Sequence, residues 1–573
     1  MKKNLLRAFF LFVIILGIIL FFIARRADRI VEPYVRSLLE QNKPMNHRIE
    51  YDQIRLNLVN RSIIVKDVRI FPDSSVVKDE HLWMEVSVNK IRLTNFKILK
   101  LLLHKKLSIG DFILLKPVAA VYLPSKTIHK DETEVVKDTI VKPKAPLLGS
   151  ISLERVTLDG GSFSLFHKGV KLASSDDINF VAEQISLVKN KLDEPVGYSY
   201  GDVKVNLSDI SLQFATGLYN MSLKHFALNK QDSSVVLKEF RMIPKYKKGE
   251  FEENLEFQND RFDVRVGTLN IEGVGYRRLL NGQPLEISKI HIDELNADIY
   301  RDKNVRVDSN HFPQFYNESF LKINSPIRLD TLLVSNSIVK YGELAEGKEK
   351  AGEILLEDFK LHIFDLSNIL TDSTPDPEMQ VFINAMVMGE GSLNVELVLP
   401  LTGRLHDFKC SGSVGSMKLS PLNDMLEPSI NMKFIKGDLN RMTFAFSAND
   451  NISSGWMEFL YQDLDIELLK KDPEKQWGFI SLMANAVAVS NNPAPGKELK
   501  IVTVGYERNK YKGLINYVWK TIQSGMINTI LPTKKHQINW KQAEKEKSNG
   551  TTTPEKNNKK KKDRSKKKKR KKK

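Results

Sequence analysis

Two stretches of this chain share one apolar pattern: IRLTNFKILKLLLHKKLSIGDFILLKPVAAVY at Ile91–Tyr122 and LNIEGVGYRRLLNGQPLEISKIHIDELNADIY at Leu269–Tyr300. The second stretch begins 178 positions after the first, and no insertion or deletion is needed to align them. Apolar residues stand at equivalent positions in both, for example Phe112 and Ile290. An internal repeat of this length predicts a duplicated structural unit.

The repeat extends on both sides of these stretches. Upstream, Ser62–Pro72 matches Ser234–Pro244 at an offset of 172, and downstream Ile151–Leu187 matches Ile327–Ile363 at an offset of 176. Changes of a few residues in the offset are expected in loops. The two copies therefore cover most of the first two thirds of the chain.

The repeated pattern alternates apolar and polar residues, as Val86 and Val88 or Val264 and Val266 illustrate. A period of two indicates β-strands with one face against apolar material and one against water. We therefore expect a mainly β fold built mostly from antiparallel sheet, with a few short helices. Stacked copies would form an elongated body with a continuous apolar face, and two closed sandwiches are the alternative.

The net charge of +17 is concentrated in a C-terminal tail. Lys559–Lys573 contains eleven lysines and two arginines against one aspartate, a charge of +12, which leaves about +5 for the rest. The 42% hydrophobic and 27% charged residues are typical of a folded protein. Cys410 is the single cysteine, which excludes an internal disulfide framework and a cysteine-based metal site.

The N-terminus carries a membrane-anchor pattern. Ala8–Ala24 is a run of seventeen residues without charge or proline, flanked by Arg7 and Arg25. This length is at the short end for a membrane span, and no small-residue cleavage site follows it. We interpret residues 1–28 as an uncleaved signal anchor, a transmembrane helix that leaves the body outside the cytoplasm, and a cleaved signal peptide is the alternative.

The remaining boundaries follow from changes in composition and pattern. A helix with an apolar stripe is expected at Tyr511–Leu531, where it either caps the sheet or contacts a membrane surface. The expected segments are a membrane-proximal helix and linker at 29–50, the first β repeat at 51–217, the second at 218–370, a C-terminal β module with the terminal helix at 371–535, and a disordered lysine-rich tail at 536–573.

No catalytic or metal-binding motif is present in the sequence. There is no His-Glu-x-x-His and no Gly-x-Ser-x-Gly motif. Gly342–Glu349 has the glycine–lysine spacing of a phosphate-binding loop but places Glu349 where Mg²⁺ coordination needs Ser or Thr. We therefore expect no enzymatic activity, no metal and no cofactor.

The order of these elements resembles the AsmA-like family of Gram-negative envelope proteins. The likeness rests on the anchor followed by a β body, on Val86–Tyr122, on Val414–Pro428 followed by Ile435–Leu439, and on Gly455–Leu469. The resemblance implies a curled β-sheet with a repeating apolar groove, an inner-membrane anchor and a periplasmic body. It also implies a role in outer-membrane biogenesis and lipid homeostasis, in which phospholipid acyl chains are carried along the groove.

This interpretation gives two sets of candidate binding residues and leaves other functions open. An envelope scaffold with closed β domains is one alternative, and nonspecific nucleic-acid binding by the basic tail is another. The groove candidates are Ile91, Leu93, Leu107, Ile109, Phe112, Leu269, Ile271, Leu285, Ile287 and Ile290, and the tail candidates for an anionic surface are Lys559, Lys560, Lys566, Lys567 and Lys571.

Overall fold

The computed structural model describes residues 47–57, 61–72, 82–95, 97, 100, 104, 106–124, 150–188, 197–213, 217–276, 278, 283–369, 377–469 and 488–530. The chain divides into two compact units, Met1–Arg241 and Met242–Lys573. Within the described residues, no helix is long and apolar enough to cross a membrane. The predicted anchor at 1–28 and the lysine-rich tail at 536–573 lie outside these residues.

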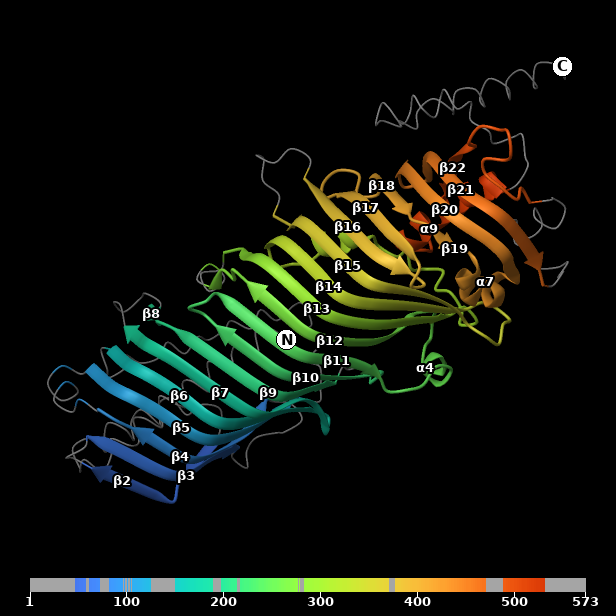
Figure 1. Cartoon of the computed structure of the whole chain (residues 1–573). Coiled ribbons are helices and arrows are strands. Elements are labelled where there is room, and N and C mark those ends of the chain that lie inside the picture. The colour runs from blue at the N-terminus through green and yellow to red at the C-terminus, as the bar shows by residue number, and fades with distance from the viewer. Residues whose placement is uncertain are drawn as a thin grey trace, which may run out of the picture. The chain divides into compact units, whose positions relative to one another are not determined.

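The first unit is a β-sheet in which most strands pair with the next strand in the chain (Figure 1). The short strands β1 and β2 both pair with β3, and β9 pairs with both β7 and β10. The strands are β1 (His47–Glu50), β2 (Gln53–Asn57), β3 (Ser62–Pro72), β4 (Trp83–Leu93), β5 (Lys106–Leu123), β6 (Ser150–His167), β7 (Val170–Val188), β8 (Gly197–Ser199), β9 (Val203–Gln213), β10 (Tyr219–Asn229) and β11 (Ser234–Pro244), which crosses the boundary between the units.

The second unit continues the same construction with a sheet and a few short helices. Each strand from β12 to β17 pairs with its successor, β18 and the short β19 both pair with β20, and β20 pairs with β21 and β21 with β22. The elements are α4 (Glu250–Glu253), β12 (Asp260–Glu272), β13 (Leu285–Asp302), α6 (Tyr316–Leu321), β14 (Ile327–Leu344), β15 (Gly352–Ser367), β16 (Glu378–Val387), β17 (Gly391–Pro400), β18 (Phe408–Val414), β19 (Met417–Lys418), η2 (Ser420–Leu422), α7 (Asn423–Ile430), β20 (Met432–Ala448), β21 (Ile452–Leu468), β22 (Ile501–Glu507) and α9 (Leu514–Ile530).

The mainly β prediction is confirmed, and most neighbouring strands pair antiparallel as expected, but the sheet is mixed. Strands β5 and β6 pair in parallel, and so do β13 and β14. In each case more than twenty residues join the two strands, 124–149 and 303–326, which is enough chain to return along the sheet and start again in the same direction. Apolar and polar residues alternate in the same way in parallel and antiparallel strands, so the sequence pattern does not distinguish the two kinds of pairing.

The register of the strands confirms the internal repeat. Ile91 pairs with Leu114 in the first copy, and the residues 178 positions later, Leu269 and Ile292, pair in the second. The parallel pairs also correspond, because Leu107 faces Ile151 and Leu285 faces Ile327. The equivalence ends at the next hairpin, where the register of β14 with β15 is displaced by five residues from that of β6 with β7, and a longer turn joins the strands.

A left-handed residue interrupts the alternation at equivalent points of both copies. Lys116 and Glu294 stand 178 positions apart and have φ values of 49° and 55°. A further pair, Asp67 and Glu239, stands 172 positions apart with φ values of 51° and 52°. A left-handed residue inside a strand changes which face the following side chains take. On the partner strands β4 and β12, a three-residue step between apolar positions, Val88 to Ile91 and Val266 to Leu269, lies opposite Lys116 and Glu294.

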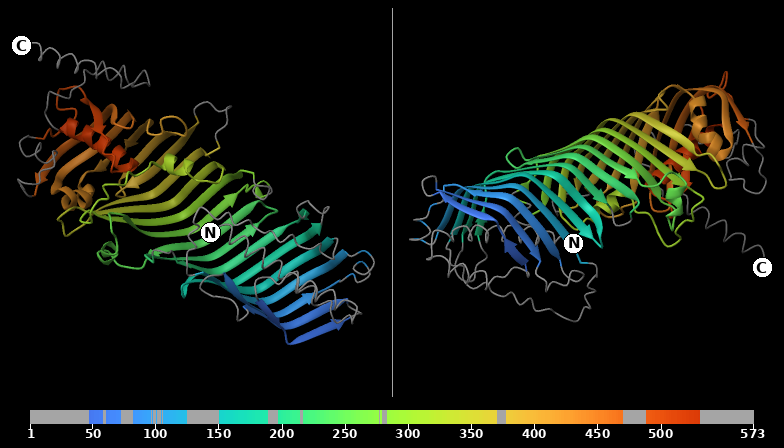
Figure 2. Two further views of the ribbon diagram at one scale, coloured as in Figure 1. Left: turned by 180° about the vertical axis from the view of Figure 1, so that it is seen from behind. Right: turned by 90° about the horizontal axis from the view of Figure 1, so that it is seen from below.

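The helix expected at Tyr511–Leu531 is confirmed as α9, which lies across the last strands of the second unit (Figure 2, left). Its Gly525 packs so closely on Val504 and Met457 that an added Cβ would come within 2.5 Å of Val504. Ser524 and Asn528 bond to the backbone of β22 at Gly505 N–H and Thr503 C=O. The helix therefore caps the sheet and satisfies polar groups of its last strand.

Candidate functional site

Apolar residues form two continuous rows across ten strands of the second unit. Residues that pair across neighbouring strands lie on the same face of a sheet, so the register identifies each row. The first row is Ile271, Ile290, Leu332, Ile363, Val381, Leu397, Cys410, Phe446, Gly455 and Val504, and the second is Leu269, Ile292, Val334, Leu361, Ile383, Val395, Gly412, Phe444, Met457 and Val502. We call this surface the apolar face of the second unit.

The apolar face is buried at one end and partly open at the other. From β16 to β22 it belongs to a core that includes Phe446, Met457 and Val504, which are at most 4% exposed and lie beneath α9. From β12 to β15, in contrast, its side chains are half-buried, with the exception of buried Val334. An aliphatic row that the fold leaves half-buried is a surface on which an apolar ligand can replace water.

The structure places all five groove candidates of the second copy on strands of this partly open section. Leu269 and Ile271 lie on β12, opposite Ile292 and Ile290 of β13, and all four side chains are half-buried. The remaining candidates, Leu285 and Ile287, are also half-buried and face Ile327 and Leu329 of β14.

The corresponding candidates of the first copy lie in a closed core. Ile91, Ile109 and Phe112 are 0% exposed and Leu93 is 1% exposed, within one cluster that spans β3 to β6. Leu107 belongs to β5, but its side chain is outside the described residues. The partly open part of this unit lies further along, on β7, β9 and β10, where the half-buried apolar side chains include Phe180, Val205, Leu207, Phe226 and Leu228.

A row of charged residues borders the apolar face of the second unit. Asp260, Arg301 and Glu343 occupy one register row, two residues beyond the apolar row of Phe262, Ile299 and Tyr341. The Arg301 guanidinium donates two hydrogen bonds of 2.6 Å to the Asp260 carboxylate. Lys303 lies 2.5 Å from the Glu343 carboxylate. The face thus changes from apolar to ionic over two residues along each strand. The first copy has Leu82, Leu123 and His167 at the matching positions, so this border is particular to the second unit.

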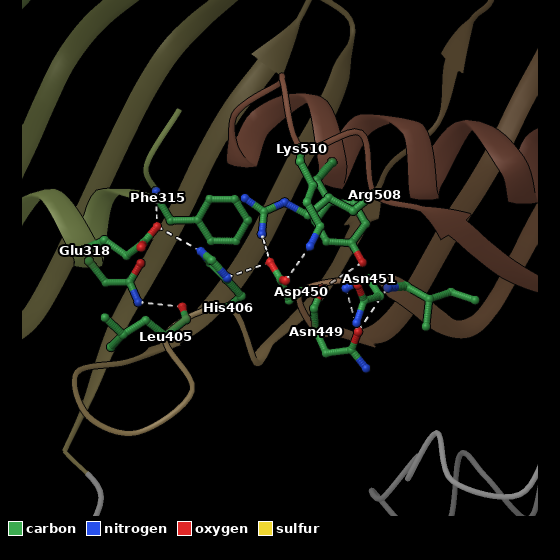
Figure 3. A network of polar contacts seen from close by, with 12 residues as sticks. Phe315, Glu318, Leu405, His406, Asn449, Asp450, Asn451, Arg508 and Lys510 are labelled. Carbon is green, nitrogen blue, oxygen red and sulfur yellow. Dashed lines mark hydrogen bonds and ion pairs between the residues drawn. The ribbon is translucent and has the colours of Figure 1, made fainter. Parts of the chain in front are cut away.

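A polar network fastens the connection between β13 and β14 onto the closed end of the second unit (Figure 3). The His406 ring contacts the Glu318 carboxylate at 2.9 Å through Nε2 and the Asp450 carboxylate at 2.8 Å through Nδ1. Asp450 also accepts hydrogen bonds from Arg508 and Lys510, at 2.6 and 2.7 Å.

Buried groups anchor this network. Phe315 is 0% exposed, and its ring lies 4.8 Å from His406 and 4.3 Å below the Arg508 guanidinium. The neighbouring Asn317, also 0% exposed, donates to the carbonyl groups of Pro400 and Leu405. These contacts come from segments far apart in the sequence, and they hold α6 against the core.

Electrostatics favours the charged form of both carboxylates in the network. The Lys510 hydrogen bond is the largest effect that lowers the pKa of Asp450, and His406 and Arg508 lower it further. Burial alone raises the pKa of Glu318, but the Phe315 N–H and His406 outweigh it, so the net pKa is lowered. Every member of the network bonds to another side chain or to the backbone. This is typical of a structural hydrogen-bond network rather than of a free acid or base.

The structure locates the side chains and the loop that could bind a metal ion or phosphate. Across these ranges, no group of three or more His, Cys, Asp or Glu side chains is arranged to hold a metal ion. Gly342–Glu349, the near match to a phosphate-binding loop, occupies the end of β14 and the turn to β15 and has no helix N-terminus behind it. Burial raises the pKa of the Cys410 thiol, which keeps that group protonated within the core.

A cavity of about 330 Å³ lies between β22 and α9. Backbone and side chains of Thr503, Gly505, Ser524, Ile527 and Asn528 line it, so its walls mix polar and apolar groups. These residues already bond across the same gap, and the cavity contains no ionisable side chain. It is better explained by the packing of the helix on the sheet edge than by a ligand site.

Comparison with known proteins does not identify a family. Neither protein-family models nor curated proteins match this chain.

Proposed function

We propose that this protein binds lipid acyl chains along the apolar faces of its β-sheets and carries phospholipid in support of outer-membrane biogenesis, as an AsmA-like envelope protein anchored in the inner membrane. The observation that supports the proposal most directly is the pair of apolar rows in the second unit. Apart from the buried Val334 they stay half-buried over β12 to β15, and from Leu361 and Ile363 of β15 onward they pack against a closed core.

An acyl chain needs a long aliphatic surface and little else. Each methylene group that it buries contributes about 0.8 kcal/mol, so a chain lying across several strands gains stability without any polar contact. The spacing between strands, about 4.8 Å, lets successive side chains of a row cover the ligand continuously. Such a surface selects for hydrocarbon rather than for a particular headgroup.

The charged border gives the headgroup a place to remain in water. A charge moved onto the half-buried aliphatic rows would lose hydration without gaining a partner. Asp260, Arg301 and Glu343 lie at the edge of the same face, where both signs of charge are available. We infer that the acyl chains lie across the face and the headgroup stays at or beyond this border.

A charge placed on the apolar face tests the proposal. Ile287→Asp introduces a carboxylate into the half-buried section, whereas Ile338→Asp introduces one at a 40% exposed position on the opposite face. We expect lipid to co-purify with the wild-type chain and with Ile338→Asp, and to be lost from Ile287→Asp. Mass spectrometry measures the lipid and circular dichroism checks folding. Should Ile287→Asp unfold, Ile287→Thr provides a milder polar change, for which reduced lipid is expected.

A scaffold without lipid transport is the second candidate function. The observation that favours it is the closed core of the first unit, where Ile91, Ile109 and Phe112 are inaccessible to a ligand. A scaffold predicts that wild-type and Ile338→Asp preparations carry no lipid. Native preparations free of lipid would therefore replace the transport proposal with this one.

The location of the protein is a separate part of the proposal. An uncleaved anchor at residues 1–28 would leave the β units in the periplasm. Alkaline phosphatase fused after Gln41 or after Leu370 is then expected to be active. Activity of cytosolic reporters at both positions, and not of the phosphatase, would reverse the topology and remove the envelope role.

A further inference from the structure

Four large apolar side chains are exposed beside one another at the start of α9. Phe312 is 55% exposed, Tyr511 44%, Ile515 57% and Trp519 45%. Most large apolar residues of this unit are buried or half-buried, so a group of four on the outside of a capping helix requires an explanation. We call this group the aromatic ridge.

Ring stacking joins two members of the ridge, and helical spacing relates the other two. The Phe312 and Tyr511 rings stack with their centroids 5.1 Å apart. Gly513, two residues further, approaches Pro313, since an added Cβ would lie 3.9 Å from the proline ring. Ile515 and Trp519 are one helical turn apart, which puts them on the same side of α9.

The other side of α9 holds the ridge in place. Leu514, Tyr517 and Ile522 belong to the core of the second unit, and Tyr517 packs 5.8 Å from Phe408. Thr521 bonds to Ser453 on β21 at 2.7 Å. A helix with apolar side chains on both its inner and outer faces suits a position between a protein core and a second apolar medium.

The chain segment that carries α9 has charges of one sign. The segment from Arg508 to Ile530 contains four cationic side chains and no acidic one. Arg508 and Lys510 are paired with Asp450. In contrast, Lys512 donates to the amide oxygen of Gln258, and Lys520 to that of Gln523.

Two cations beside the ridge are therefore suited to an external anion. Burial lowers the pKa of Lys512 and of Lys520, and the positive charge of Lys303 lowers both further. The nearby carboxylates, Asp260 and Glu343, counteract this in part and are already bonded to Arg301 and Lys303. An anionic oxygen brought to Lys512 or Lys520 would stabilise the charged form of either group.

We propose that the aromatic ridge docks on an anionic lipid bilayer. Tyr, Trp and Phe side chains lie favourably at the level of lipid headgroups, and lysines beside them reach the phosphates. The absence of acidic side chains from Arg508 to Ile530 favours an anionic bilayer over a neutral one. This contact goes beyond acyl-chain binding on the apolar faces and does not depend on it.

A probe on α9 tests the contact without interference from the basic tail. Asn516→Cys places a thiol at a half-buried position of α9, next to Ile515 and three residues before Trp519, for an environment-sensitive nitrobenzoxadiazole label. Cys410 is 1% exposed and will not compete for the label. The matched control is Lys409→Cys, at an exposed position of β18. The full-length labelled chain, kept soluble with amphipol, is mixed with vesicles that contain nitroxide-labelled lipid.

The proposal predicts strong quenching of the label at position 516 by vesicles that contain phosphatidylglycerol, and much weaker quenching by pure phosphatidylcholine. The label at position 409 is expected to remain unquenched. Trp519→Glu should reduce quenching at position 516 severalfold without changing the circular dichroism spectrum. Absence of quenching at 516 while the chain still sediments with the vesicles would overturn the proposal and assign vesicle binding to another segment. Equal quenching by both lipids would overturn its anionic specificity.

Discussion

Gly267 of β12 faces Glu294 of β13, and a Cβ added to the glycine would lie 2.3 Å from the glutamate carboxylate and 2.9 Å from its Cβ. Glu294 has a φ of 55°, so the close approach coincides with the left-handed residue of the strand. At the matching place in the first copy, Asn89 lies across from Lys116, whose φ is 49°. A left-handed residue therefore interrupts the alternation of side chains at the same place in both copies.

Replacing Glu294 by glycine is expected to stabilise the second unit by about 1 kcal/mol, because glycine adopts a positive φ without the steric cost of a Cβ. Glu294→Val should destabilise it, since a branched side chain tolerates this conformation least. Thermal unfolding measured by circular dichroism compares the two variants. Glu272→Val, at an exposed position at the end of β12, is the control and should change the midpoint little. Destabilisation by Glu294→Gly would contradict this account of the bend.

Much of the fold follows from local patterns. The spacing of Val264, Val266, Leu269 and Ile271 identifies a strand and its apolar face, and it contains the three-residue step that accompanies the left-handed Glu294. Nothing in the identity of Glu294 indicates a positive φ, because glutamate adopts it rarely. The residues that form the apolar face were therefore predictable from the sequence. The left-handed residue that accompanies the three-residue step between them was not.

Burial of the candidate residues was not predictable from the repeat. Ile109 and Ile287 occupy equivalent positions and have the same side chain, yet one is 0% exposed and the other half-buried. Exposure depends on what covers each sheet, and that differs between the copies. The contacts of His406 with Glu318 and Asp450 had no sequence signal either, since the first pair is separated by 88 positions.

Asn317→Asp is expected to destabilise the second unit by roughly 1–3 kcal/mol, because a buried carboxylate cannot donate to the carbonyl groups of Pro400 and Leu405. Chemical denaturation measures the free energy of unfolding. Asn310→Asp, the same change at an exposed position in the same connection, should leave it nearly unchanged. If both variants unfolded at the same denaturant concentration, the buried amide would have no anchoring role.

The polar network around His406 should make the folding stability of the second unit depend on pH in the acid range. The folded-state pKa values of Asp450 and Glu318 lie below their ordinary values of 3.8 and 4.5. Their stabilising contribution is therefore complete above those ordinary values and is lost as the pH falls below them towards the folded-state values. The groups that face the two carboxylates are His406, Arg508 and Lys510 around Asp450, and His406 and Lys322 around Glu318.

Thermal unfolding of Asp450→Asn between pH 3 and pH 7 checks this dependence. The variant is expected to be less stable than wild type at neutral pH, and the difference should shrink as the pH falls. Asp407→Asn removes a carboxylate with a single, 3.9 Å contact to Arg404 and is expected to follow the wild-type profile. A difference between Asp450→Asn and wild type that stayed constant with pH would exclude an ionic role for Asp450.

Photocrosslinking of a phospholipid tests the central claim most directly. A diazirine on the acyl chain, activated after the lipid is incubated with the full-length chain, marks the side chains that it contacts, and peptide mass spectrometry locates them. We predict crosslinks on the half-buried residues Leu269, Ile271, Ile290 and Ile363 of the apolar face. Ile338, which is exposed on the opposite face, should remain unmodified. Crosslinks confined to the opposite face, or none on β12 to β15, would contradict the proposal that this surface carries acyl chains.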